Sequence, residues 1–250
     1  TFIMFITWFE LLNFILCLFL VLIGYKYFET FWSYKINKPY AWEQSVSLKK
    51  VPSELIKLER TFRDRVRFYN FWFQIEYIKK MEIEGAFAEL GVYKGITAKA
   101  IHFMDADRRF YLFDTFNGFD PRDLKVEFQN ESKFDPSYFS DTDIGQVRDY
   151  ISGNDNIIFK KGYFPETAVG LGEERFALVH LDADLYIPTL EALKFFYPRM
   201  NPGGVIIIHD YNHTWDGIPK AVNAFVKNIP ESIIEVMDWQ GSVMIIKNKK

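Results

Sequence analysis

Four residues that can bind a metal or carry protons lie close together in the second half of the chain. Asp182 and Asp184 directly follow one apolar run, and His209 and Asp210 directly follow the next. Because neighbouring parallel strands end at one edge of a sheet, we expect these side chains to meet there. Close carboxylates repel each other unless a cation lies between them, and their oxygens favour Mg²⁺, Ca²⁺ or Mn²⁺. We therefore predict a divalent metal site at Asp182, His209 and Asp210. The alternative, for each residue considered by itself, is that the aspartate caps a helix and that His209 is a packed histidine.

A motif nearer the middle of the chain is typical of a cofactor site. Residues 89–95, with the sequence ELGVYKG, join a short apolar run to a helical pattern over 96–103. An acid at a strand end, a turn with two glycines and a following helix seat a cofactor at the carboxyl edge of a parallel sheet. Gly91 allows the backbone to approach the ligand, Gly95 allows the helix to start tightly, and Glu89 can accept hydrogen bonds from a cationic amino group. We interpret the motif as an S-adenosylmethionine site, since the spacing is not the G-x-G-x-x-G of dinucleotide folds.

Two further turns extend this predicted cofactor site. Asp114 ends the apolar run 110–113, one strand on from the glycine turn, where an acid can accept both hydroxyls of a ribose. Gly162 and Tyr163 follow the apolar run 157–159 and border the expected adenine side. Without the glycine turn Asp114 would be interpreted as a helix cap, and aromatic packing explains Tyr163 equally well.

Strand-like and helix-like segments alternate along most of the chain and predict a doubly wound α/β fold. A long helix capped by Ser53 is expected to run to the residue before Gly85, and residues 115–140 have no periodicity, which predicts a substrate lid. The last two strands form a hairpin, so one strand runs antiparallel at the sheet edge. The expected strands are 86–89, 110–113, 157–159, 176–181, 205–208, 233–237 and 242–246, and the later helices are 96–103, 141–151, 189–197 and 217–227.

The chain begins with an apolar segment that is long enough to cross a membrane. Residues 2–25 are nearly all Ile, Leu, Phe and Val, and about 20 such residues span a bilayer as a helix. Lysines and aromatic residues follow, which favours a membrane anchor with the catalytic domain in the cytoplasm. A secretory signal peptide and a buried helix at a dimer interface are the alternatives, and without an anchor the protein would be cytoplasmic. We predict an anchoring helix over 1–28, a linker over 29–52 and a catalytic domain over 53–250.

Composition limits the classes of protein to which the chain can belong. Its 250 residues fit one domain of catalytic size plus an appendage, and 49% of them are apolar, enough for a large core. The net charge of -3 provides no basic patch, so no nucleic-acid partner is expected. Cys17 is the single cysteine, which excludes an internal disulfide and a cysteine-based zinc site.

From about Arg63 to the C-terminus the sequence resembles the macrocin O-methyltransferase family. These are class I, S-adenosylmethionine-dependent enzymes that methylate sugar hydroxyls in macrolide and aminocoumarin antibiotics. The resemblance implies a seven-stranded, mostly parallel sheet with a last antiparallel strand, and an acceptor substrate that contains a sugar. It rests on the order and spacing of segments 89–95, 114–118, 161–167, 181–186, 197–199, 202–204 and 210–211, with Gly217.

The resemblance also implies roles for individual residues. Asp182 would bind magnesium with an acidic pair after the fifth strand, and Asp184 would be the general base. Here that pair is His209 and Asp210, and an imidazole shifts the preference from Mg²⁺ toward manganese, iron or zinc. His213 is a reserve base. The residues expected to bind the cofactor are Glu89, Gly91, Val92, Tyr93, Gly95, Asp114, Thr115, Gly162, Tyr163 and Asp182.

The predicted reaction is metal-assisted methylation of a sugar hydroxyl, in which the metal lowers the pKa of the hydroxyl and Asp184 removes its proton. Mg²⁺ is the first expectation for the metal and Mn²⁺ the second, and a homodimer is the expected assembly. Two other classes of function stay open at this point. One is a catalytically inactive, membrane-tethered binding subunit, and the other is a nucleotide-sugar oxidoreductase.

Overall fold

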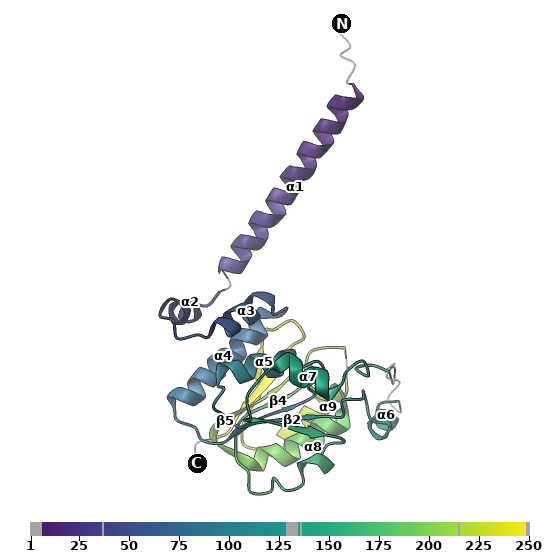
Figure 1. Cartoon of the computed structure of the whole chain (residues 1–250). Coiled ribbons are helices and arrows are strands. Elements are labelled where there is room, and N and C mark those ends of the chain that lie inside the picture. The colour runs from purple at the N-terminus through teal and green to yellow at the C-terminus, as the bar shows by residue number, and fades with distance from the viewer. Residues whose placement is uncertain (1–6, 37, 129–134, 136, 215, 249–250) are drawn as a thin grey trace. The chain divides into compact units, whose positions relative to one another are not determined.

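The computed structural model describes residues 7–36, 38–128, 135, 137–214 and 216–248. The chain divides into two compact units, Thr1–Lys50 and Val51–Lys250, both drawn in Figure 1. Residues 1–6 of the predicted anchor and 129–134 of the predicted lid lie outside the described residues.

The first unit consists of two helices, α1 (Trp8–Ile36) and α2 (Tyr40–Ser47). Within α1, the stretch Trp8–Phe31 has a mean hydropathy of 2.1 over its most apolar part, none of which is buried. It is the one helix in the described part of the chain that is long and apolar enough to cross a membrane. The expected linker over 29–52 therefore contains the end of α1 and all of α2.

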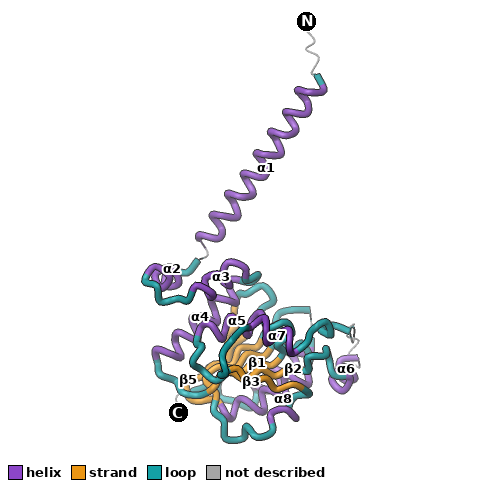
Figure 2. The backbone as a smooth tube through the Cα atoms, viewed as in Figure 1, coloured by secondary structure: helices purple, strands orange, loops and turns teal. Residues whose placement is uncertain are grey.

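The second unit is built on a seven-stranded sheet with the order β3-β2-β1-β4-β5-β7-β6, drawn in orange in Figure 2. β1 to β5 pair in parallel, and β7 is antiparallel to both of its neighbours. This confirms the predicted fold, including the antiparallel strand. The strands are β1 (Ala86–Leu90), β2 (Phe110–Asp114), β3 (Ile157–Lys161), β4 (Phe176–Leu181), β5 (Met200–Ile208), β6 (Ile234–Val236) and β7 (Ser242–Ile246).

Helices cover both faces of this sheet, which is why its central strands are continuous apolar runs (Figure 1). α4 (Arg65–Lys80), α5 (Ile96–Met104) and α7 (Ile144–Ile151) lie on one face, and α8 (Tyr186–Phe196) and α9 (Gly217–Val226) lie on the other. Under α8 the core is aromatic. The ring of Phe196 contacts those of Phe176 and Phe164 at centroid distances of 5.0 and 5.6 Å.

The order of the strands determines where a ligand can bind. β1 pairs with β2 on one side and β4 on the other, so the connections from β1 and β4 leave in opposite directions. A crevice forms at the carboxyl ends of strands where the order reverses in this way. Register places the ends of β1 and β4 side by side, with Leu90 opposite Leu181, and Leu181 opposite Ile208 of β5.

The predicted long helix from Ser53 was wrong in two respects. The chain forms two helices there, α3 (Ser53–Thr61) and α4, and the side chain of Asp64 caps α4 by accepting the Arg67 N–H at 3.1 Å. Ser53 does not cap α3, because its hydroxyl donates to the Glu54 carboxylate at 2.9 Å.

The predicted lid is not wholly irregular either. It contains the helix α6 (Pro121–Phe128), in which Leu124 is buried. Glu127 accepts the backbone N–H of Tyr186, at the start of α8, at 2.5 Å. This contact attaches the described part of the segment to the rest of the second unit.

Candidate active site

A cavity of about 670 Å³ lies at the carboxyl ends of β1, β2, β4 and β5. Its volume is within the range of about 300 to 1,000 Å³ that is usual for small-molecule sites. Glu89 and Gly95 are not part of the described lining; Glu89 is buried and Gly95 begins α5. The predicted site residues that do line the cavity are Gly91, Val92, Tyr93, Asp114, Thr115, Gly162, Tyr163, Asp182, Asp184, His209, Asp210 and His213.

The glycine turn is held against the end of β4. At Gly91 φ is +87°, and a Cβ atom there would lie 2.0 Å from the backbone carbonyl oxygen of Asp182. No side chain fits at that distance, so glycine is required by the neighbouring strand as well as by any ligand. Gly95 has φ +78°, and a Cβ atom there would lie 2.9 Å from Val147 of α7.

Asp114 holds the other side of the glycine turn. Its Oδ2 accepts the backbone N–H groups of Val92 and Tyr93 at 2.7 and 2.8 Å, and its Oδ1 accepts that of Phe116 at 2.6 Å. A carboxylate offers about four acceptor positions. The Thr115 hydroxyl is also 3.5 Å from Oδ1, but it donates its one hydrogen to the Gly118 carbonyl at 2.5 Å. One position therefore remains for a ligand hydroxyl, so binding both hydroxyls of a ribose would replace one backbone contact.

Glu89 lies behind the cavity and pairs with a histidine. Its Oε1 is 3.0 Å from Nδ1 of His180, and both side chains are buried. Burial, reinforced by the negative charge of Asp182, raises the pKa of Glu89 well above its usual value, and burial lowers the pKa of His180 to about 3. Both shifts favour the uncharged form of the side chain. Oε2 of Glu89 has no hydrogen-bond partner among the described residues, and a cationic ligand group would favour its ionised form.

Three of the predicted metal ligands do come together. Potential ligand atoms of Asp182, His209 and Asp210 all lie within 4.8 Å of one another. Nδ1 of His209 is 2.9 Å from Oδ1 of Asp182 and 3.1 Å from Oδ1 of Asp210. The same Oδ1 of Asp210 accepts a hydrogen bond from the Gln240 amide at 2.9 Å.

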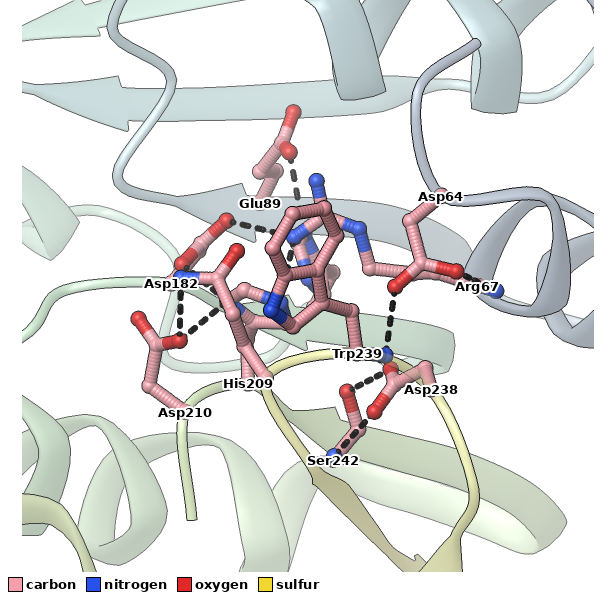
Figure 3. Close-up of polar contacts among 11 residues, drawn as sticks. Asp64, Arg67, Glu89, Asp182, His209, Asp210, Asp238, Trp239 and Ser242 are labelled. Carbon is pink, nitrogen blue, oxygen red and sulfur yellow. Dashed lines mark hydrogen bonds and ion pairs between the residues drawn. The ribbon is translucent and has the colours of Figure 1, made fainter. Parts of the chain in front are cut away.

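An arginine that the sequence did not point to completes this cluster. Arg67 reaches from α4 toward Asp182 and His209, as Figure 3 shows. Its Nη1 is 2.6 Å from Nε2 of His209 and 3.5 Å from Oδ2 of Asp182. Burial disfavours the Asp182 carboxylate, but His209 and Arg67 outweigh burial and hold the pKa of Asp182 below its usual range.

The Arg67 contact determines the tautomer of His209. A guanidinium only donates hydrogen bonds, so Nε2 must carry a lone pair and the ring proton must be on Nδ1. Burial and Arg67 lower the pKa of His209, but the carboxylates of Asp182 and Asp210 outweigh them and raise it to about 10. The electrostatics therefore favour a protonated ring, and it is the geometry of the Arg67 contact that requires the neutral one. Because two N–H donors cannot face each other at 2.6 Å, the neutral ring is the form in this contact.

These contacts provide a test of the predicted metal site. The carboxylates of Asp182 and Asp210 are ligands that a divalent ion accepts. His209 does not fit as a ligand while Arg67 is in place, since Nδ1 donates to Asp182 and the lone pair of Nε2 is occupied. The donor set therefore suits a metal in part.

Asp184 lies beside these residues and has an unusual backbone conformation. Its φ is +62° and that of Asp210 is +59°, both in the left-handed region that few residues other than glycine adopt. Burial, followed by the charges of Asp182 and Asp210 and a hydrogen bond with Asp210, raises the pKa of Asp184 well above its usual value. A carboxyl group with a raised pKa is a stronger base than an exposed aspartate.

The remaining predicted residues lie farther from this cluster. His213 lines the cavity but is exposed, and its Nδ1 is 3.2 Å from the Thr214 hydroxyl. The Tyr163 hydroxyl donates to Oδ1 of Asp123 at 2.9 Å, and the Arg122 guanidinium lies over the Tyr163 ring at 3.6 Å.

Sequence reasoning assigned no role to several residues of the cavity. Asp123 comes from the segment predicted to be irregular, and Trp239 and Gln240 come from the turn of the hairpin. Arg67 was within the predicted helix, close to the aromatic face at 69 and 73. The only available signal was the expected need for a cation among the aspartates.

A family model and individual relatives match this chain. The model of Macrocin-O-methyltransferase (TylF) matches residues 33–246. The chain is 29% identical over 163 residues to 8-demethyl-8-(2,3-dimethoxy-alpha-L-rhamnosyl)-tetracenomycin-C 4'-O-methyltransferase of Streptomyces olivaceus. This alignment covers 58% of this chain and 60% of that protein. The chain is also 29% identical over 159 residues to Mycinamicin III 3''-O-methyltransferase of Micromonospora griseorubida, which covers 58% of this chain and 62% of that protein. The chain thus spans less than two thirds of these relatives' length.

Solved structures share the fold. The O-methyltransferase NovP superposes with a TM-score of 0.61 at 21% identity, over 74% of this chain and 80% of that one. The calicheamicin methyltransferase CalS11 superposes with a TM-score of 0.59 at 17% identity, over 84% of this chain and 93% of that one. The family model covers most of the length, and five of the segments that carried the resemblance contribute residues to one cavity, namely 89–95, 114–118, 161–167, 181–186 and 210–211. The chain therefore belongs to the macrocin O-methyltransferase family.

Proposed function

We propose that this protein transfers a methyl group from S-adenosylmethionine to a hydroxyl group of a sugar. The observation that supports this most directly is the meeting of Asp182, Asp184 and Asp210 with the glycine turn around one cavity. The named relatives act on sugar-bearing molecules, which supports a sugar as the acceptor.

The residues of the cavity fit the cofactor. The turn at Gly91 and the acceptor position left on Asp114 would hold the nucleoside, and the unpartnered oxygen of Glu89 would favour the cationic amino group. When bound, the cofactor supplies a methyl group on a sulfonium centre, which is already a strong electrophile. The protein must therefore chiefly align that methyl group and make the acceptor oxygen nucleophilic.

Asp184 is the proposed general base. Its carboxylate would accept the proton of the sugar hydroxyl as the oxygen attacks, and its raised pKa makes it a better acceptor than an exposed aspartate. Asp210, which is hydrogen-bonded to Asp184, would orient it. His213 is the reserve base. Metal assistance by Mg²⁺ or Mn²⁺ stays a prediction from the sequence, and no step above depends on it.

The test of this function is methyl transfer from labelled S-adenosylmethionine to sugar-containing extracts. Asp184→Asn should reduce turnover at least about 100-fold, because proton transfer typically contributes that much, and should leave the affinity for S-adenosylhomocysteine nearly unchanged. Asp107→Asn, at an exposed position, is the matched control. Unchanged turnover in Asp184→Asn would remove the residue from its role. Binding of NAD instead of S-adenosylhomocysteine would favour the oxidoreductase.

We also propose that α1 anchors the protein in a membrane with the catalytic domain in the cytoplasm. The length and hydropathy of the stretch Trp8–Phe31 support this, and Lys26 and Lys38 add positive charge toward its C-terminal side. A lipid-linked or cell-surface glycan would then be a natural acceptor. Removing residues 1–36 should move the protein from the membrane fraction to the soluble fraction. If the shortened protein stays in the membrane fraction, α1 is not the anchor.

A further inference from the structure

Arg67 is held in place by the residues that form the wall of the site. Its backbone N–H donates to Oδ1 of Asp64 at 3.1 Å, and Oδ2 of Asp64 accepts the N–H of Trp239 at 2.8 Å. The first turn of α4 is thereby tied to the hairpin turn whose next residue, Gln240, donates to Asp210 at 2.9 Å. The side chain of Arg67 is only 16% exposed, and its guanidinium lies 5.8 Å from the ring centre of Phe62.

The Arg67 guanidinium contacts His209 and Asp182, two of the residues that a metal ion would need as free ligands. Nη1 of Arg67 donates to Nε2 of His209, which places the ring proton on Nδ1, between the two aspartates. For Nδ1 to bind a metal it must lose this proton, and the proton must then move to Nε2. Nε2–H and Arg67 would be two donors facing each other, so Arg67 would have to leave.

The charge of the site leads to the same conclusion. Arg67 already neutralises part of the charge of Asp182, at 3.5 Å, and a divalent cation beside it would be repelled.

We infer that Arg67 is the resident cation of this site and that it excludes a divalent ion from Asp182, His209 and Asp210. The exclusion of the ion does not depend on the proposed function. Its consequence, methyl transfer without a metal, does rest on that function. In that reaction Arg67 is a positioning residue. It holds His209 in one tautomer and keeps Asp182 ionised.

The experiment measures Mn²⁺ binding to the purified full chain in detergent, from the electron paramagnetic resonance signal of free Mn²⁺. Arg60→Met, which removes an exposed arginine of α3, is the matched control and should bind Mn²⁺ as weakly as the wild type does. Arg67→Met, which removes the charge and keeps much of the length, should bind Mn²⁺ at least tenfold more tightly. The affinity for S-adenosylhomocysteine and the midpoint of thermal unfolding would show that this variant is folded.

Two outcomes would overturn the inference. One is a wild type that binds Mn²⁺ as tightly as Arg67→Met. If Arg67→Met does not fold, micromolar binding of Mn²⁺ by the wild type is enough to overturn the inference. The other is methyl transfer that stops with EDTA and returns with Mn²⁺. Because Mn²⁺ binding is measured without turnover, the two proposals can fail separately: if Arg67→Met gains Mn²⁺ binding but the wild type transfers no methyl group, the proposed function is refuted and the role of Arg67 is supported.

Discussion

Replacing Asp123 with asparagine should stabilise the protein at neutral pH. Asp123 lies on α6, is 5% exposed and accepts the Tyr163 hydroxyl at 2.9 Å. Burial raises its pKa from 3.8 to about 6, against the hydrogen bond from Tyr163. Asparagine keeps the acceptor oxygen for Tyr163 and removes the buried negative charge.

The sign follows from the pKa values of the two states. Because the folded protein holds the proton more tightly than the unfolded chain, the stability linked to Asp123 is fully present below about pH 4 and is lost as the pH rises through about 6. The difference between 3.8 and about 6 corresponds to at most about 3 kcal/mol. Asp123 lines an open cavity, so solvent screens part of this penalty and we expect about 1 to 2 kcal/mol.

The assay is urea unfolding of the full chain without cofactor, near pH 4 and near pH 7.5. The free energy of unfolding of Asp123→Asn minus that of the wild type should increase by about 1 to 2 kcal/mol between the two pH values. Asp107→Asn, at an exposed position, should show no such increase. A difference that is the same at both pH values, or that falls, would refute the assignment of a buried charged carboxylate.

Three further predictions concern the predicted site. Gly91→Ala should lower the free energy of unfolding by about 2 to 4 kcal/mol and abolish S-adenosylhomocysteine binding, because its Cβ would meet backbone 2.0 Å away; Gly172→Ala, with nothing within 4 Å, should do neither. Asp114→Asn should weaken S-adenosylhomocysteine binding about tenfold or more by calorimetry, since it removes the charged acceptor of the Val92 and Tyr93 N–H groups. The free energy of unfolding of Asp184→Ala should be about 1 kcal/mol lower than that of Asp184→Asn, because asparagine tolerates φ +62° better than alanine does. Equal midpoints of urea unfolding would contradict this.

The strands of this fold were predictable because their signal is local. β4 was predicted with its observed bounds, since a strand buried on both faces is a continuous apolar run. The predicted helix from Ser53 failed at Asp64, because the apolar periodicity continues across the break. Asp64 caps α4 by accepting the Arg67 N–H, and its other oxygen accepts the N–H of Trp239, which is distant in the sequence. α6 was missed for the same reason, since Glu127 is held by Tyr186.

The acids of the site were predictable and their environment was not. Asp114, Asp182 and Asp210 each follow a strand, and the fold brings strand ends together whatever the loops do. Asp123 and Trp239 reach the cavity from a short helix and a hairpin turn, whose placement depends on packing. Sequence alone also explained Gly91 by the ligand, whereas the structure adds the backbone of Asp182.

The reasoning about charge required a positive group among the carboxylates, and Arg67 is such a group beside Asp182; the metal ion stays a prediction. Several carboxylates at one sheet edge must be neutralised, either by protonation or by a positive group. In this protein the raised pKa of Asp184 favours its uptake of a proton, and Arg67 compensates part of the charge of Asp182. An arginine provides one positive charge and donates hydrogen bonds but cannot coordinate the acceptor oxygen as a Lewis acid does. With Arg67 as the cation, activation of the sugar hydroxyl therefore depends on Asp184, whose raised pKa makes it the stronger base that such a site requires.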